Sequence, residues 1–141
     1  MQTFLPYEDF KKTAEVLDMK RLGKQRVESL QIYNALTIPG KRGWTNHPAS
    51  QMWKNHMWWL FHYSIEICVE WRRRGYRDSL LPKFLGLIET VEAGSYPPWL
   101  GDERLHSSHR ANLLRKDATF YGQYGWSENP TMGYYWPTKD V

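Results

Sequence analysis

MKRLGKQRVESLQIY, residues 19–33, is the stretch on which the interpretation of this chain depends. Its apolar residues recur at helical spacing and Asp18 precedes it as an N-cap, so we expect a helix over about residues 18–36. Four cations, Lys20, Arg21, Lys24 and Arg26, share this helix with one nearby acid, Glu28. One acid among several cations suits chemistry on a polyanion, so this helix is the first place to look for a site.

Two residues of this helix, Gly23 and Arg26, fall on its apolar face when positions are placed at 100° steps. Glycine weakens a helix by about 1 kcal/mol relative to alanine, but it lets another segment approach closely. A buried guanidinium needs a partner. Two interpretations stay open: Arg26 pairs with an acid inside the fold, or the helix ends at Gly23 and its phase resets.

The remaining sequence predicts further helices and no strands. A loop is expected over residues 37–46, and the tail from Phe120 is rich in Gly, Pro and aromatic residues. The predicted fold class is therefore all-α, one compact helical domain over residues 1–141 with an irregular, aromatic-rich C-terminal tail. The helices expected besides the second one cover residues 8–17, 48–74, 78–92 and 109–117.

Composition limits the possible functions. The chain has 141 residues, a net charge of +4, eight Trp and one cysteine, Cys68, which excludes an intramolecular disulfide and any multi-cysteine metal site. Cys68 lies in an apolar helical pattern, which predicts a buried, inert thiol. No apolar run is long enough to span a membrane and no leader is evident, so we expect a soluble, cytoplasmic protein and a monomer.

The loop at residues 37–46 combines two cations, Lys41 and Arg42, with Trp44. This combination suits a phosphate backbone and a base, although solvated loop charges are the alternative. Tryptophans beside Gly or Pro are stacking platforms or lids over the core. They are Trp44, Trp99, Trp126 and Trp136. No phosphate-binding glycine loop or metal motif occurs in the sequence, so we predict no metal and no cofactor.

Four segments, taken in order, resemble the pyrimidine-dimer DNA glycosylase family. They are KRLGKQRVE (20–28), GWTNHP (43–48), EWRRRGYRD (70–78) and SSHRANLLRKDATFYG (107–122). The similarity spans most of the chain. Each motif alone is weak, and their common order carries the resemblance.

The resemblance implies a compact all-α enzyme that kinks duplex DNA and flips a base. It implies an N-terminal α-amine as nucleophile, a Schiff base with the sugar, and strand nicking assisted by a helix glutamate. An α-amine has a pKa near 8, against about 10.4 for lysine, so more of it is neutral at pH 7. The catalytic residues carried over are Met1 and Glu28. The residues expected to contact DNA are Arg21, Lys24, Arg26, Lys41, Arg42, Trp44, His47, His109 and Arg110.

The sequence departs from the family pattern at two positions. A phage member presents Thr after a removed Met, whereas Gln2 has a long side chain that normally prevents removal, so the amine belongs to Met1. An ungapped alignment places Gly23 where the family has its catalytic glutamate. Either Glu28 takes that role or the chemistry is weakened. In the simplest alternative, Glu28 forms a solvated pair with Lys24 one turn away.

Two functional hypotheses follow. The first is a DNA-repair glycosylase with abasic-site lyase activity, which excises a pyrimidine dimer or another altered pyrimidine from double-stranded DNA. The alternative is a catalytically impaired DNA-binding module on the same scaffold.

Overall fold

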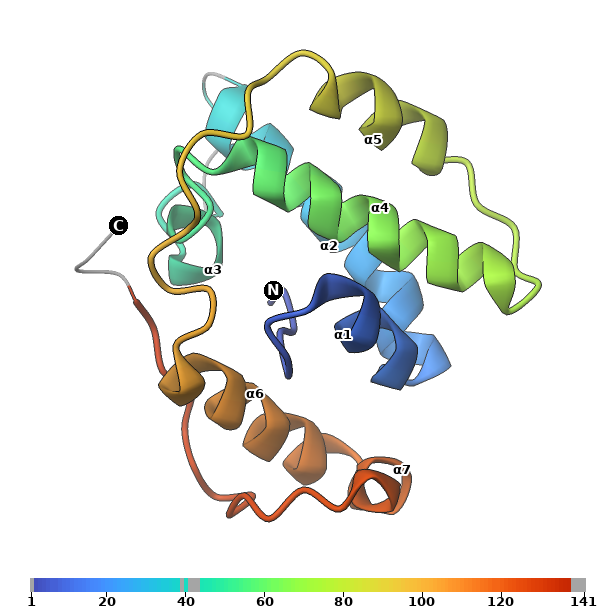
Figure 1. Cartoon of the computed structure of the whole chain (residues 1–141), viewed down its shortest axis with the longest axis vertical. Coiled ribbons are helices and arrows are strands. Elements are labelled where there is room, and N and C mark those ends of the chain that lie inside the picture. Colours follow the sequence, from blue (N-terminus) through green and yellow to red (C-terminus); the bar gives the residue numbers. More distant parts are fainter. Residues whose placement is uncertain (1, 39, 41–43, 138–141) are drawn as a thin grey trace.

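The computed structural model describes residues 2–38, 40 and 44–137, and within these ranges its regular elements are helices, with no strand (Figure 1). The all-α prediction is therefore confirmed. The helices are α1 (Phe10–Val16), α2 (Met19–Thr37), α3 (Pro48–Gln51), α4 (Met57–Arg73), α5 (Leu81–Ile88), α6 (Glu103–Lys116) and α7 (Ala118–Tyr121), followed by a 3-10 turn, η1 (Gly122–Tyr124).

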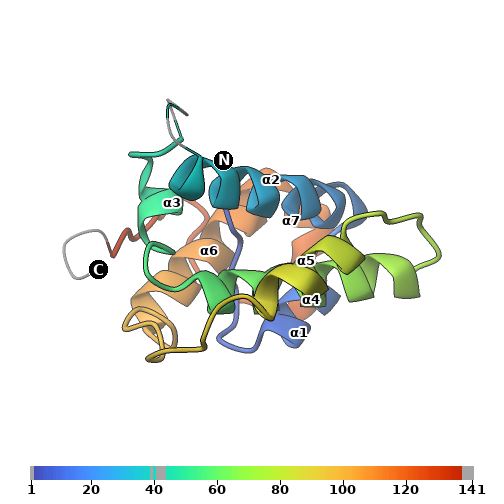
Figure 2. The same cartoon turned by 90° about the horizontal axis from the view of Figure 1, so that it is seen from above.

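The helices surround the N-terminal segment. Helix α4 packs against α1, α2 and α5, and α6 lies across the segment from α4 (Figures 1 and 2). The core includes Leu22, Ile32, Leu60 and Ile67 from α2 and α4, and a smaller cluster joins α4 to α5. None of the described helices is long and apolar enough to cross a membrane.

Helix α2 is one continuous helix, as the first of the two interpretations requires. Asp18 caps it, accepting a hydrogen bond from the Arg21 backbone N–H. Arg26 donates from Nε to Asp78 Oδ1 at 2.8 Å, and its guanidinium lies over the Trp71 ring. The acid that the sequence left unnamed is therefore Asp78, from the turn before α5.

Gly23 lets Trp71 approach α2 closely, as expected for a glycine on the apolar face. A Cβ atom there would lie 2.9 Å from Cη2 of Trp71, a side chain of α4. The inward face of α2 differs from the expected one, because Met19 and Val27 are exposed while Gln25 and Ser29 are buried. The polar pair is buried because it bonds to backbone atoms.

The long helix predicted over residues 48–74 is wrong, because the chain forms α3 and α4 with a break between them. Asn55 takes a left-handed φ of 69°, a conformation that asparagine tolerates better than most residues. The break buries Trp53, whose Nε1 donates to Thr3 Oγ1 at 3.0 Å. Burial of a large ring and the donation of Trp99 Nε1 to the Met52 carbonyl stabilise the break.

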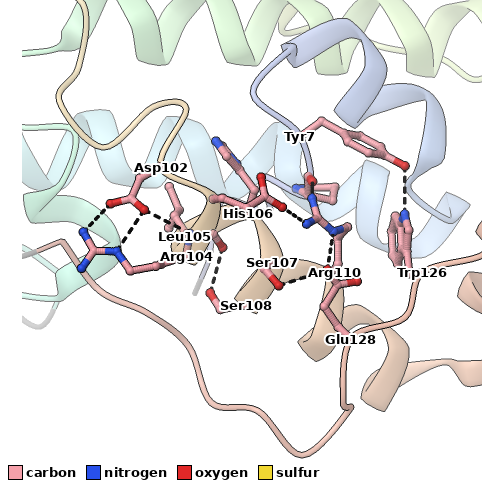
Figure 3. Close-up of polar contacts among 12 residues, drawn as sticks. Tyr7, Asp102, Arg104, Leu105, His106, Ser107, Ser108, Arg110, Trp126 and Glu128 are labelled. Carbon is pink, nitrogen blue, oxygen red and sulfur yellow. Dashed lines mark hydrogen bonds and ion pairs between the residues drawn. The ribbon is translucent and has the colours of Figure 1, made fainter.

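Helix α6 begins six residues before the predicted start at residue 109. Asp102 caps it, accepting from the Arg104 backbone N–H at 3.0 Å (Figure 3). Ser108 instead donates to the Leu105 carbonyl and accepts from the Tyr135 backbone N–H, so it fixes the tail. The tail is irregular over its described part, as predicted. The prediction of a buried Cys68 is confirmed, and burial is the main cause that raises the pKa of its thiol to about 12.

Candidate active site

The N-terminal segment, residues 2–6, is buried and extended, and side chains satisfy much of its backbone. The Gln25 side chain of α2 makes hydrogen bonds to two backbone groups of this segment. Its Nε2 donates to the Gln2 carbonyl at 2.8 Å, and its Oε1 accepts from the Phe4 N–H at 2.9 Å. The Tyr63 hydroxyl of α4 donates to the Phe4 carbonyl at 2.8 Å. Buried backbone groups need such partners, so these side chains fix the path of the segment.

Helix α6 holds the same segment from the other side. The Leu5 N–H donates to Nδ1 of His109 at 2.8 Å, and Nδ1 of His106 lies 2.7 Å from the Leu5 carbonyl oxygen. Since Nδ1 of His109 is an acceptor, its ring proton is on Nε2. His106 takes the opposite tautomer, because its Nε2 accepts from the Gly101 N–H at 2.9 Å.

His109 was predicted to contact DNA, but it has no exposed surface with which to do so. Burial lowers its pKa to about 3, so the ring is neutral at ordinary pH. Its role in the structure is to hold Leu5. The aromatic rings of Phe4 and Tyr134 lie edge-on to it.

Arg110, another predicted DNA contact, is occupied within the fold (Figure 3). It pairs with Glu103 and with Glu128, at 2.9 Å for the latter, and donates to the Pro6 carbonyl at 2.7 Å. Burial lowers its pKa, but the two carboxylates outweigh this effect and raise it. Arg110 therefore joins α6, the tail and the N-terminal segment, as Arg26 joins α2 to Asp78.

The N-terminal segment leads directly to Glu28. The Gln2 backbone N–H donates to Oε2 of Glu28 at 3.0 Å. Both residues line a cavity of about 360 Å³ between α2, α6 and the tail. The α2 wall supplies three cations, and α6 adds Lys116. The α2 cations are Lys20, Arg21 and Lys24.

Aromatic and imidazole rings also line this cavity. His47, Phe4, Tyr134 and Trp136 line it. The His47 ring meets those of Trp44 and Trp136 edge-on, at centroid distances of 5.2 and 5.8 Å. The cavity thus combines cations with rings, a combination suited to a nucleotide, which has a phosphate and a flat base.

The structure brings together four of the predicted site residues, Glu28, Arg21, Lys24 and His47, in one cavity. Arg26 does not line the cavity and lies beside Gly23 and Trp71 in a neighbouring groove, which shares Lys20, Lys24 and Glu28 with the cavity. Trp44 is exposed and contacts His47, whereas Trp99 is a core residue. Met1, Lys41 and Arg42 lie outside the described residues.

Sequence reasoning missed Gln2, Gln25 and Tyr134 as parts of the site. In the sequence, Gln25 is one of several polar residues on a basic helix. Its burial in the structure distinguishes it from the exposed ones. Gly23 lines the neighbouring groove and not the cavity, so a carboxylate at that position would point toward Trp71. Glu28 is the acid of α2 that the cavity contains.

A metal centre finds no support in the described parts of the chain, where no three His, Cys, Asp or Glu side chains gather at ligand spacing. The cavity offers one carboxylate and one imidazole among lysines and an arginine. A set of this kind suits an anionic substrate better than a cation.

Comparison with protein families gives a match to pyrimidine dimer DNA glycosylase over residues 1–81. The matched region contains α1 to α4 and, within the cavity, Gln2, Glu28 and His47, whereas Lys116, Tyr134 and Trp136 come from beyond it. Comparisons with curated proteins and with solved structures gave no match. The family match covers more than half of the chain, and the chain therefore belongs to the pyrimidine dimer DNA glycosylase family, which makes DNA its substrate.

Proposed function

We propose that this protein is a DNA glycosylase with abasic-site lyase activity, which excises a pyrimidine dimer or another altered pyrimidine from duplex DNA. The observation that carries the proposal is the hydrogen bond from the Gln2 backbone N–H to Glu28 Oε2, within a cationic cavity. Gln2 follows Met1 in the sequence, so the α-amine of Met1 is one residue from the atom that binds Glu28.

The proposed reaction starts with the neutral α-amine of Met1. Its nitrogen attacks the sugar C1′, and the C1′–N bond to the base breaks with its electron pair leaving on the base. The nitrogen, now bonded to C1′, loses a proton, and its lone pair forms the C1′=N bond of a protonated Schiff base as the C1′–O4′ bond breaks, with the electron pair of that bond and a proton passing to O4′. Glu28 then removes a C2′ proton, the C3′–O bond breaks, and the 3′ phosphate leaves with that electron pair, which nicks the strand.

The cations of the cavity have a separate part in this proposal. Lys24 and Lys20 lie one and two turns before Glu28 on α2, with Arg21 next to Lys20, and the three would hold the phosphates that flank the lesion. Tyr134 and Trp136 offer ring faces or edges for an extruded base. Phosphate binding, base binding and chemistry would then use different residues of one cavity.

A borohydride trap tests the proposal. The protein is incubated with irradiated duplex DNA, or with duplex that carries an abasic site, and sodium borohydride reduces any Schiff base to a stable adduct. We expect an adduct with both substrates, and peptide mass mapping should locate it at Met1. Binding without an adduct would favour the impaired DNA-binding module, and an adduct at a lysine would reassign the nucleophile.

A further inference from the structure

His47 has two chemically distinct ring nitrogens in this structure. The Ala49 backbone N–H donates to Nδ1 at 3.0 Å, which makes His47 the N-cap of α3. Nδ1 is therefore an acceptor, and in the neutral ring the proton is on Nε2. The helix cap thus fixes the tautomer and leaves Nε2–H as the free donor of the ring.

This donor is next to the cavity. His47 lines it, and no described residue accepts a hydrogen bond from Nε2. The rings of Trp44 and Trp136 meet the imidazole edge-on and fix its plane. Burial lowers the pKa of His47, so the ring stays neutral at ordinary pH.

A neutral donor among aromatic rings matches one part of a nucleotide better than the others. Phosphates have Lys20, Arg21 and Lys24 available on the α2 wall, where full positive charges attract them. The base would lie against the rings that line the cavity, and the carbonyl oxygens of a pyrimidine accept hydrogen bonds from neutral N–H groups. His47, whose ring contacts those of Trp44 and Trp136, would then lie beside the base.

We propose that Nε2–H of His47 donates a hydrogen bond to a carbonyl oxygen of the pyrimidine that leaves. This inference rests on the proposed glycosylase function and deepens it. As the C1′–N bond breaks, its electron pair passes to the base and negative charge spreads onto the carbonyl oxygens. A donor fixed in advance stabilises that charge more in the transition state than in the ground state. His47 keeps its proton throughout the step.

Two substitutions separate this role from helix capping. In His47→Asn, the amide oxygen replaces Nδ1 and keeps a good N-cap, but no group reaches the place of Nε2. In His47→Gln, the longer side chain can return an N–H near that place. His62→Asn, in α4 and outside this cavity, is the matched control for loss of a histidine.

The measurement compares two rates for each protein in single turnover: base excision from irradiated duplex, and nicking of duplex with a preformed abasic site. We expect His47→Asn to slow base excision by about 100-fold, the usual effect of losing one such donor, and to slow abasic nicking far less. His47→Gln should recover part of the loss, and His62→Asn should match the wild type in both rates.

Each other outcome overturns a defined statement. Base excision by His47→Asn at the wild-type rate would leave capping as the whole role of His47. An equal fall in both rates would move the contact to the sugar or a phosphate and overturn the assignment to the base. If the wild-type protein itself forms no borohydride adduct, the proposed function fails first, and this inference fails with it.

Discussion

Glu28 is the residue on which the proposed chemistry depends, and Glu28→Gln tests it with little change in shape. The amide oxygen can still accept from the Gln2 N–H, so the N-terminal segment should keep its place. An amide is not a base, however, and loss of general base catalysis lowers turnover by about 100-fold or more. We expect DNA affinity to stay within about threefold, since the cations proposed to bind phosphates remain.

Nicking of abasic duplex and a binding titration measure the two effects. Glu66→Gln in α4, a substitution outside the cavity, is the control. Unchanged turnover in Glu28→Gln would assign the role to another acid and leave Glu28 as a partner of the backbone alone.

Gly23→Ala should destabilise the protein although alanine favours a helix. The new Cβ would lie 2.9 Å from Cη2 of Trp71, closer than carbon atoms tolerate. Trp71 cannot move freely, because its Nε1 donates to the Arg77 carbonyl and its ring stacks on Tyr76. We expect a net loss of about 1 kcal/mol in the free energy of unfolding, with overpacking outweighing helix propensity.

Urea unfolding followed by circular dichroism measures this change. Gly86→Ala is the matched control, because Gly86 lies in α5 and a Cβ there meets nothing within 4 Å. That variant should gain up to about 1 kcal/mol from helix propensity alone. If Gly23→Ala had the same free energy of unfolding as Gly86→Ala, the Trp71 side chain would move aside at little energetic cost.

A helix could be predicted from the sequence where all the residues that determine it lie within one short segment. Asp18 as the cap of α2 and the apolar spacing after it are local features, and both were predicted correctly. The break at Asn55 was missed, because it depends on Trp53 reaching Thr3 and Trp99 reaching Met52, which are distant in sequence. Gln25 was missed for the same reason, since its partners Gln2 and Phe4 belong to another segment.

The pairing of α6 with the N-terminal segment makes stability depend on pH. The pKa of His109 is lowered to about 3, and that of His106 is also lowered, in both cases mainly by burial. Below the ordinary histidine pKa of about 6.5, the unfolded chain binds protons that the folded chain does not. Stability should therefore be full above about pH 6.5 and fall as the pH drops below it, by up to about 1.4 kcal/mol per pH unit for each histidine.

Urea midpoints between pH 7 and pH 4.5 measure this slope. His109→Asn is the comparison, because its amide oxygen can accept from the Leu5 N–H without taking up a proton. We expect a shallower slope for this variant. The depressed pKa values of Asp18 and Asp78 act at lower pH and should not mask the difference. Equal slopes would contradict the assignment to His109.

At the scale of the whole molecule, some cations are exposed at the cavity and others are held in ion pairs within the fold. The salt dependence of DNA affinity should distinguish the two groups. Lys24 is exposed at the cavity, whereas Arg110 is held by Glu103, Glu128 and the Pro6 carbonyl. Lys24→Gln should reduce the slope of log affinity against log salt by about one unit, the effect of one lost phosphate contact. Arg110→Gln should lower the free energy of unfolding and leave that slope unchanged.

Fluorescence anisotropy with an abasic duplex at several salt concentrations gives the slope of log affinity against log salt for each variant. The unfolding free energies come from urea titrations of the same proteins. A large loss of slope in Arg110→Gln would show that its ion pairs open when DNA binds.

The family match ends at residue 81, but the cavity is completed by residues from α6 and the tail. We expect the described chain to unfold in one cooperative transition, as a single domain does, because the N-terminal segment is bonded to α2, α4 and α6 together. This arrangement also explains why the site could be predicted only in part from the sequence. Its walls come from both ends of the chain.

The hydrogen bond from Leu5 to His109 joins residues 104 positions apart. During synthesis, the first residues leave the ribosome long before α6 exists, and contacts of such sequence separation form slowly. Until His106 and His109 emerge, the backbone of Leu5 lacks the partners that hold it in place. A growing chain would thus carry its N-terminal segment unanchored by α6, and the cavity would be complete only once synthesis has passed Trp136.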